Sequence, residues 1–229
     1  DVCSSDLSAK LEKQLKERAA VCRKAAKQLS EKRQEAAKEL EKRITSQLRE
    51  LNMPSVRFAV DFSPVETEEG FDASGADKVR FIMSANAGEE LGRISRIASG
   101  GELSRIMLAM KNVFAENDPV STMIFDEIDT GVSGIAAQRV GEKLFSVSLG
   151  KQVMCVTHLP QIAAMADNHY LISKEEKNGR TFTAVSKLDR EGRKRELARL
   201  HGGDNITPLT LASAEEQLEA AERYKAHVS

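Results

Sequence analysis

The sequence of 229 residues predicts an α/β fold with a mostly parallel sheet, preceded by one long helix. Residues 8–51 contain neither Pro nor Gly and consist largely of Ala, Leu, Glu, Lys, Gln and Arg, which are strong helix formers. From Gly88 onward, short apolar segments alternate with amphipathic ones. This alternation is typical of parallel strands connected by helices that cover the sheet.

The long helix carries an apolar stripe with a seven-residue spacing. Its first row is Leu15, Cys22, Leu29 and Ala36, its second row is Ala19, Ala26, Arg33 and Leu40, and Ile44, Leu48 and Leu51 continue it. A seam rich in Ala and interrupted by Arg buries little surface alone, so we expect a partner helix in a coiled coil. A solvated single helix or an ordinary bundle helix is the alternative.

Three parts are therefore expected: a leader at 1–7, a coiled-coil arm at 8–52 and a lobe at 53–229. The leader reads like a translated adapter, and we set it aside as non-native, with an ordinary chain terminus as the alternative. Asn52-Met53-Pro54 ends the arm. Strands are predicted at 56–62, 79–84, 123–125, 153–157, 170–173 and 181–187. Helices are predicted at 102–115, 135–147, 159–166 and from about 209, with a basic turn at 190–195 before a further short helix.

Composition excludes some classes of function. The net charge is −1, so any contact with DNA needs a local basic patch, for which Arg190, Arg193, Lys194 and Arg195 are candidates. A solvated turn is the alternative for these four residues. No apolar run has the length of a membrane span. The three scattered cysteines lack metal-ligand spacing and favour a reducing cytoplasm.

The first candidate site is Ser99-Gly100-Gly101-Glu102 at the start of a predicted helix. Glycines let a ligand approach the backbone, Ser99 supplies a hydroxyl, and the free N–H groups of the first helical turn attract phosphate. A helix cap followed by glycines for close packing explains the same four residues, and in isolation it is the better explanation.

The second candidate site follows the apolar strand 122–125, which ends in Asp126 and Glu127. Ligands bind at the carboxyl ends of strands in open α/β sheets. Asp126 is placed to hold Mg²⁺ through water, and Glu127 to orient or deprotonate an attacking water. A solvated strand end is the alternative reading for an isolated Asp-Glu pair.

The third candidate is His158, which follows the apolar strand 153–157. It lies 31 positions after Glu127, one helical crossover away. Because that crossover places the two strands side by side, His158 is expected beside Asp126, where it could donate to a γ-phosphate.

In this order and spacing, the three elements resemble the ABC-type (P-loop) ATPase head. They match its signature loop, its Walker B strand and its switch histidine, and Asp129 matches the D-loop aspartate. A long arm that leads directly into the signature-bearing lobe, with Glu102 where transporters usually have Gln, is similar to the SMC-like branch. The stretches 97–109, 125–134, 157–163 and 195–207 are very similar to the RecN family of bacterial DNA repair proteins.

The resemblance implies that the chain is the C-terminal lobe of such a head with its returning coil. No Gly-x-x-x-x-Gly-Lys-[Ser/Thr] loop is present in the sequence, so ATP hydrolysis by the chain alone is not expected. Asp126, Glu127 and His158 would serve ATP and Mg²⁺ in their own head. Ser99, Gly100, Gly101, Glu102 and Asp129 would contact nucleotide between two heads.

The partners implied by the resemblance are the N-terminal half of the same protein, a second head in a homodimer, and DNA, with no membrane. It further implies a cytoplasmic, nucleoid-associated role in the repair of double-strand breaks. The alternatives are another SMC-like or Rad50-like head and a non-catalytic coiled-coil interaction module. A Ser-His hydrolase is disfavoured because Ser99 is not in a Gly-x-Ser-x-Gly elbow.

Overall fold

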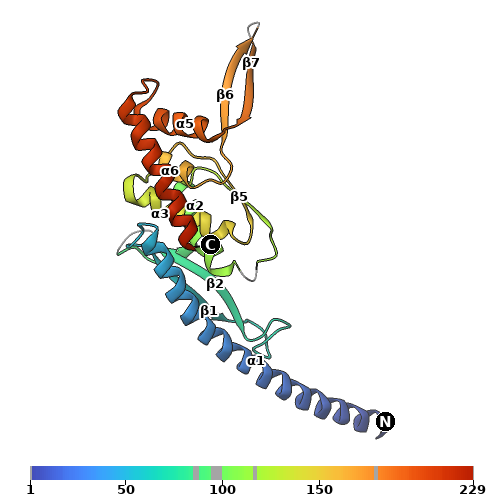
Figure 1. Cartoon of the computed structure of the whole chain (residues 1–229). Helices are drawn as coiled ribbons and strands as arrows, with labels where there is room; N and C mark the ends of the chain where they lie inside the picture. The colour runs from blue at the N-terminus through green and yellow to red at the C-terminus, as the bar shows by residue number, and fades with distance from the viewer. Residues whose placement is uncertain (1, 85–87, 94–99, 116–117, 178–179, 229) are drawn as a thin grey trace. The chain divides into compact units, whose positions relative to one another are not determined.

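A computed structural model describes residues 2–84, 88–93, 100–115, 118–177 and 180–228 (Figure 1). The chain divides into two compact units. The arm unit contains residues 1–46 and 55–97, and the head unit contains residues 47–54 and 98–229. The expected boundary between residues 52 and 53 thus lies inside a segment of the head unit, and the first strands group with the arm.

The arm unit joins a long helix to a small antiparallel sheet. Helix α1 (Val2–Glu50) is followed by β1 (Arg57–Pro64), β2 (Asp77–Ser84) and the short β3 (Gly92–Arg93), in the order β1-β2-β3. The strands run along the helix (Figure 1). The amide of Val60 donates to Oε1 of Glu41 at 2.7 Å, so the helix also satisfies a backbone donor of the sheet.

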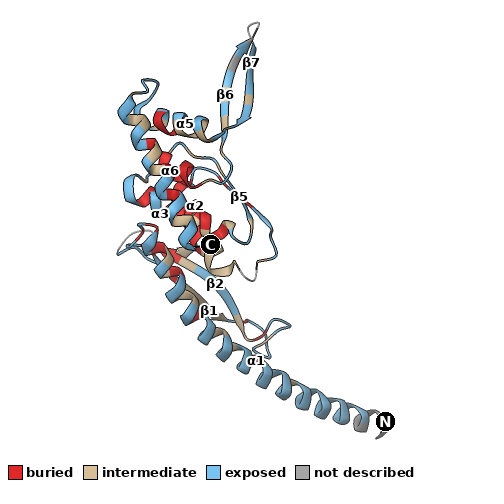
Figure 2. Cartoon of the chain, viewed as in Figure 1, coloured by how far each residue is buried: buried red, intermediate tan, exposed pale blue. Residues whose placement is uncertain are grey.

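Only part of the predicted seam of α1 is buried within the arm unit. Ala26 and Ile44 are buried, whereas Leu15 is 67% exposed and Leu29 is 39% exposed. Residues 7–25 of the helix are exposed, apart from the partly buried Ala19 (Figure 2). Part of the seam is thus buried without a second helix. A partner helix for the first row stays a prediction.

The head unit contains the α/β part of the chain. Its helices are α2 (Gly100–Phe114), α3 (Gly134–Ser148), α4 (Pro160–Ala164), α5 (Arg190–Gly202) and α6 (Pro208–Val228). Its strands are β4 (Thr122–Phe125), β5 (Gln152–Cys155), β6 (Tyr170–Lys177) and β7 (Arg180–Lys187). None of the helices in the described part of the chain combines the length and the hydropathy that a membrane span requires.

Strands β4 and β5 pair in parallel, with Met123 opposite Val153 and Phe125 opposite Cys155. Helix α3 provides the crossover between them, as the sequence predicts. Among the described strands this is the one parallel pairing, and it forms a sheet of its own in the α/β part of the chain. The connections between β1 and β2 and between β6 and β7 contain no helix, and both of these pairs are antiparallel.

The core of the head unit lies between helices. Phe145 of α3, Leu197 of α5 and Leu218 of α6 belong to one buried cluster. The predicted basic turn at 190–195 is wrong, because these residues form the first turns of α5. The physical reason is an N-cap: the side chain of Asp189 accepts a hydrogen bond from the amide of Gly192 at 2.7 Å and starts the helix.

Candidate functional site

The two adjacent carboxylates follow β4 directly. Asp126 and Glu127 are both exposed, at the carboxyl end of the strand. The amide of Glu127 donates to Oδ1 of Asp126 at 3.0 Å. Glu127 has a φ of 56°, in the left-handed region that non-glycine residues rarely occupy. The backbone therefore turns sharply at Glu127, where the buried strand ends.

The end of β5 lies beside this turn. The amide of Val156 donates to the carbonyl of Phe125 at 2.9 Å, which continues the parallel pairing one residue past β5. The next two residues meet Asp129: Oδ2 of Asp129 accepts from Oγ1 of Thr157 at 2.6 Å and from the amide of His158 at 2.8 Å. Nδ1 of His158 also lies 3.0 Å from that oxygen. The prediction that His158 emerges on the strand next to β4 is confirmed.

The start of α2 packs closely on the same turn. A Cβ at Gly100 would lie 2.8 Å from Oε2 of Glu127, and a Cβ at Gly101 would lie 2.7 Å from the carbonyl oxygen of Thr130. Both glycines are thus in close contact with the loop that follows β4. Ser99 lies outside the described residues. Glu102 is half-buried in the first turn of α2.

Two further side chains of α2 hold the loop that follows β4. Oγ of Ser104 donates to the carbonyl of Asp126 at 3.0 Å, and Nη1 of Arg105 donates to the carbonyl of Thr130 at 2.7 Å. Arg105 is only 6% exposed. Burial lowers the pKa of its guanidinium, against a raising effect of the Glu102 carboxylate. The helix and the loop are therefore joined at both ends of the segment 126–130.

Ser104, Arg105 and Thr157 were not assigned roles from the sequence. The first two lie in the stretch that resembles the RecN family, two and three residues after Glu102. Their polar side chains at successive helical positions gave no indication that both would face the chain's own loop. Thr157 precedes the histidine, and its hydroxyl contact depends on a tertiary approach of Asp129.

The carboxylates of Asp129 and Asp126 also act on the thiol of Cys155. Burial, followed by the charges of Asp129 and Asp126, raises the pKa of the Cys155 thiol to about 12. The thiol therefore stays protonated at neutral pH, and it is unsuited to act as a nucleophile or a metal ligand. Within the described residues no group of three His, Cys, Asp or Glu side chains is placed to hold a metal ion.

Three of the four basic residues considered for DNA contact are engaged within the head unit. Arg190 pairs with Glu215 at 2.7 Å and also with Glu222. Lys194 lies 3.1 Å from Glu215. Arg193 donates to the carbonyl oxygens of Ala164 and Ala166 at 3.1 and 2.8 Å. These contacts favour a structural role for the three cations.

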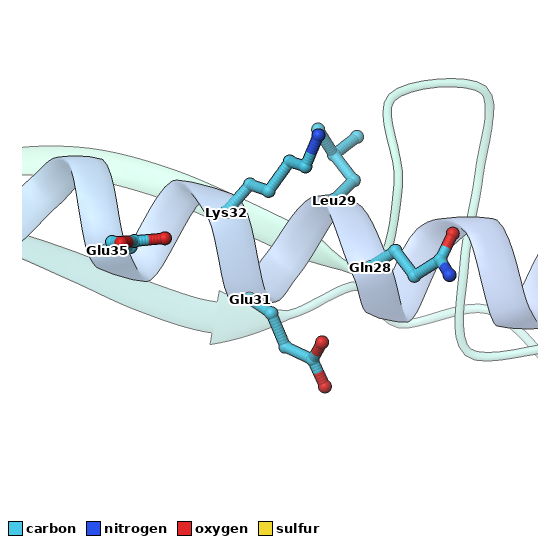
Figure 3. A pocket seen from close by; sticks show the side chains of 5 residues that line it. All are labelled: Gln28, Leu29, Glu31, Lys32 and Glu35. Carbon is cyan, nitrogen blue, oxygen red and sulfur yellow. The ribbon is translucent and has the colours of Figure 1, made fainter.

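An open hollow on α1 carries no functional indication. Figure 3 shows the side chains that line it: Gln28, Leu29, Glu31, Lys32 and Glu35. The Glu31 side chain points away from those of Leu29 and Lys32, so the lining groups do not converge on a common point (Figure 3). The candidate site is therefore the cluster of α2, the 126–130 loop and the end of β5.

Comparisons with known proteins identify relatives of the sequence and of the fold. No protein-family model matches the sequence. The chain is 46% identical over 196 residues to the DNA repair protein RecN of Halalkalibacterium halodurans, a match that covers 84% of this chain and 34% of that protein. It is 42% identical over 216 residues to RecN of Bacillus subtilis, covering 87% and 37%. The chain thus spans about a third of the length of these curated relatives.

Among solved structures, the crystal structure of an Smc head domain with a coiled coil and joint from Pyrococcus yayanosii matches with a TM-score of 0.54. The match has 21% sequence identity and covers 86% of this chain and 36% of that one. The fold is therefore that of part of an SMC-type head domain with its helical arm. Within that class, the chain belongs to the RecN family.

Proposed function

We propose that this chain is the C-terminal part of a RecN-type, SMC-like ATPase that acts in DNA double-strand break repair and recombination. The observation that carries the proposal is the convergence of two exposed carboxylates after β4, the histidine after β5 and the start of α2 on one loop. Residues far apart in sequence, at 100–105, 126–130 and 157–158, contact one another there.

The donor set fits a magnesium nucleotide. Mg²⁺ in phosphate sites is usually held by one or two carboxylates together with water and phosphate oxygens. Asp126 is an exposed carboxylate at a strand end and would hold the ion through water. When bound, Mg²⁺ neutralises developing charge on the phosphates. Glu127 would orient or deprotonate the attacking water, and His158 would contact the γ-phosphate.

The start of α2 is proposed to face a nucleotide shared with a second head. Gly100 lies against the Glu127 side chain. A phosphate that contacts the residues 99–102 would therefore lie directly beside Glu127, the proposed base. In this proposal, ATP joins two heads, with Glu102 and Asp129 at the junction, and hydrolysis separates them.

A missing part of the head is the proposed partner of an exposed apolar sheet face. Ile124 is 70% exposed, Met154 is 54% exposed and Val156 is 53% exposed, and they share one face of the β4–β5 pair. The opposite face buries Met123 and Phe125. Parallel strands are normally covered on both faces. The N-terminal half of the protein, which would carry the phosphate-binding loop, is the proposed cover.

DNA is proposed as a partner on the basis of family membership, with the heads and the arm as its contact surfaces. A cytoplasmic, nucleoid-associated location is proposed on the same basis. The contacts of Arg190, Arg193 and Lys194 with the head unit itself favour other basic residues for binding DNA.

The experiment that tests the proposal is ATP hydrolysis by this chain, alone and mixed with a matching N-terminal half. We expect turnover only in the mixture, and we expect Glu127→Gln to abolish it. If that variant still binds ATP, its loss of turnover is a loss of the hydrolysis step and not of the binding site. No turnover in a well-folded mixture would favour a non-catalytic interaction module. Turnover by the chain alone would contradict the expectation that the N-terminal half must supply the phosphate-binding loop.

A further inference from the structure

The hydroxyl of Ser104 donates to the candidate site and not to its own helix. A serine within a helix commonly donates to the carbonyl oxygen four residues earlier. Ser146 of α3 does so, with its Oγ 3.0 Å from the carbonyl oxygen of Glu142. Oγ of Ser104 donates instead to the carbonyl oxygen of Asp126, 22 positions away in the sequence, also at 3.0 Å. The hydroxyl of Ser104 therefore holds the loop that carries the two exposed carboxylates.

The carbonyl that Ser104 holds belongs to the peptide group between Asp126 and Glu127. A peptide group is planar and moves as one unit. Ser104 holds the oxygen of this group, and Oδ1 of Asp126 accepts from its N–H at 3.0 Å. The following peptide group is also held, because the carbonyl of Glu127 accepts from the amide of Thr130 at 3.1 Å. The two backbone torsions of Glu127 thus lie between two anchored peptide groups.

Glu127 needs this anchoring because of its backbone conformation. Its φ of 56° lies in the left-handed region, which is unfavourable for a residue with a Cβ. Such a conformation persists only where the surrounding contacts fix it. Close packing keeps the helix near, since a Cβ at Gly101 would lie 3.1 Å from the carbonyl oxygen of Glu127. Without the bond from Ser104, the peptide group before Glu127 could rotate and carry the carboxylate away.

We propose that Ser104 is a positioning residue for Glu127. Its hydroxyl orients the peptide group that precedes Glu127 and so directs the carboxylate towards the attacking water. The serine acts through the backbone and not on the reacting atoms. Because Ser104 belongs to α2, it also connects the start of that helix, where a nucleotide of a second head is proposed to bind, to the proposed base. This role rests on the proposed function and adds a residue to it.

The first test compares two variants of Ser104 in the full-length protein. Ser104→Ala removes the hydroxyl, and Ser104→Thr keeps it. In Ser104→Ala we expect kcat for ATP to fall by roughly fivefold or more, with KM changed less than about twofold, because the base is displaced while the nucleotide contacts remain. In Ser104→Thr we expect kcat within about twofold of the wild type. An unchanged kcat in Ser104→Ala would overturn the proposal.

Ser146→Ala is the matched control. Ser104 and Ser146 are both half-buried helical serines of the head unit, and each donates to a carbonyl oxygen at 3.0 Å. We expect the two alanine variants to lose similar amounts of melting temperature, because each loses one such hydrogen bond. Only Ser104→Ala should lose turnover. Equal values of kcat in the two variants would show that Ser104 contributes to stability alone, and the positioning role would then be excluded.

The last measurement needs no ATPase activity. The full-length protein is synthesised cell-free with ¹³C at the backbone carbonyl of Asp and ¹⁵N at the amide of Glu, so that only Asp-Glu peptide groups give a carbonyl-to-nitrogen correlation. In this chain that pair occurs at 126–127, and Glu127→Gln identifies its signal by its loss. We expect Ser104→Ala to move the carbonyl signal upfield, because the carbonyl loses a hydrogen bond, and Ser146→Ala to leave it in place.

The carbonyl signal distinguishes failure of the inference from failure of the proposed function. A signal that stays in place in Ser104→Ala would show that the serine does not hold the peptide group before Glu127, and the inference would fail. A protein without any ATPase activity would contradict the proposed function, and the carbonyl signal would then decide by itself whether Ser104 orients Glu127.

Discussion

Nη1 of Arg105 donates a hydrogen bond of 2.7 Å to the carbonyl oxygen of Thr130 and so connects α2 to the loop after β4. The guanidinium is buried with the helix, while Ser104 holds the other end of the loop at Asp126. One turn of α2 therefore fixes the backbone on both sides of Glu127. The shape of the candidate site depends on this connection as much as on the carboxylates themselves.

Arg105→Ala should destabilise the head unit by about 2 kcal/mol or more. The change removes a buried hydrogen bond and leaves space beside the helix, and each effect costs on the order of 1–3 kcal/mol. Urea unfolding followed by circular dichroism measures the loss. Arg23→Ala is the control, because the Arg23–Glu69 pair is exposed on both sides and should contribute less than about 1 kcal/mol. Equal losses in the two variants would contradict the structural role of Arg105.

Alanine at the two glycines should have different consequences. At Gly101, a Cβ would lie 2.7 Å from the backbone oxygen of Thr130, so Gly101→Ala should cost about 1–3 kcal/mol in unfolding free energy. At Gly100, the nearest atom is the end of the flexible Glu127 side chain. Gly100→Ala should therefore keep the melting temperature but displace the carboxylate and lower ATP turnover in the completed head. If Gly100→Ala destabilised the protein more than Gly101→Ala, the result would contradict the observed packing.

Cys155 should resist thiol reagents. With a pKa of about 12, only about one thiol in ten thousand is ionised at pH 8. Cys22 is exposed on α1 and should be labelled by a maleimide under the same conditions. Mass spectrometry of a Cys3→Ser background, after brief labelling, compares the two positions. Rapid modification of Cys155 in the folded protein would show that its surroundings are more open than described.

Acid should weaken the head unit through His169. Burial, followed by the charge of Arg193, lowers the pKa of His169, against a raising effect of Glu196. Its Nδ1 is buried with no hydrogen-bond partner among the described residues. Because the unfolded chain then binds the proton more readily, stability is complete above the ordinary histidine pKa of about 6.5 and falls as the pH drops below it.

One substitution distinguishes the contribution of His169 from that of other acid-sensitive groups. His169→Gln should lose less melting temperature between pH 7 and pH 5 than the wild type does. His201→Gln is a suitable control, because His201 is exposed and contacts Gln217 at 3.0 Å. If both variants kept the full wild-type pH dependence, the sensitivity would originate elsewhere.

Sequence patterns predicted the elements better than their contacts. The helix-strand alternation placed β4, α3 and β5 within a residue or two, because buried parallel strands and an amphipathic crossover leave clear apolar patterns. The strand pairing then followed from the handedness and length of the crossover. The same reasoning placed His158 beside the strand that ends in Asp126 and Glu127.

Other features depend on tertiary contacts that no local pattern encodes. The seam of α1 was expected to face a second helix, yet Ala26 and Ile44 are buried within the arm unit. The many charges of the segment 190–195 predict a turn. In the structure Asp189 caps the N-terminus of a helix there, and its side chain accepts a hydrogen bond from the amide of Gly192. Arg105 showed no sign of burial in the sequence, since its partner is a backbone carbonyl 25 residues away.

The left-handed backbone of Glu127 has a consequence for how this position would change under different selections. A φ of 56° favours Gly or Asn over Glu by about 1 kcal/mol. A library selected only for heat resistance should therefore replace this glutamate early, whereas a library selected for turnover should retain it. The residue found at position 127 would then indicate whether a population had been selected for heat resistance or for turnover.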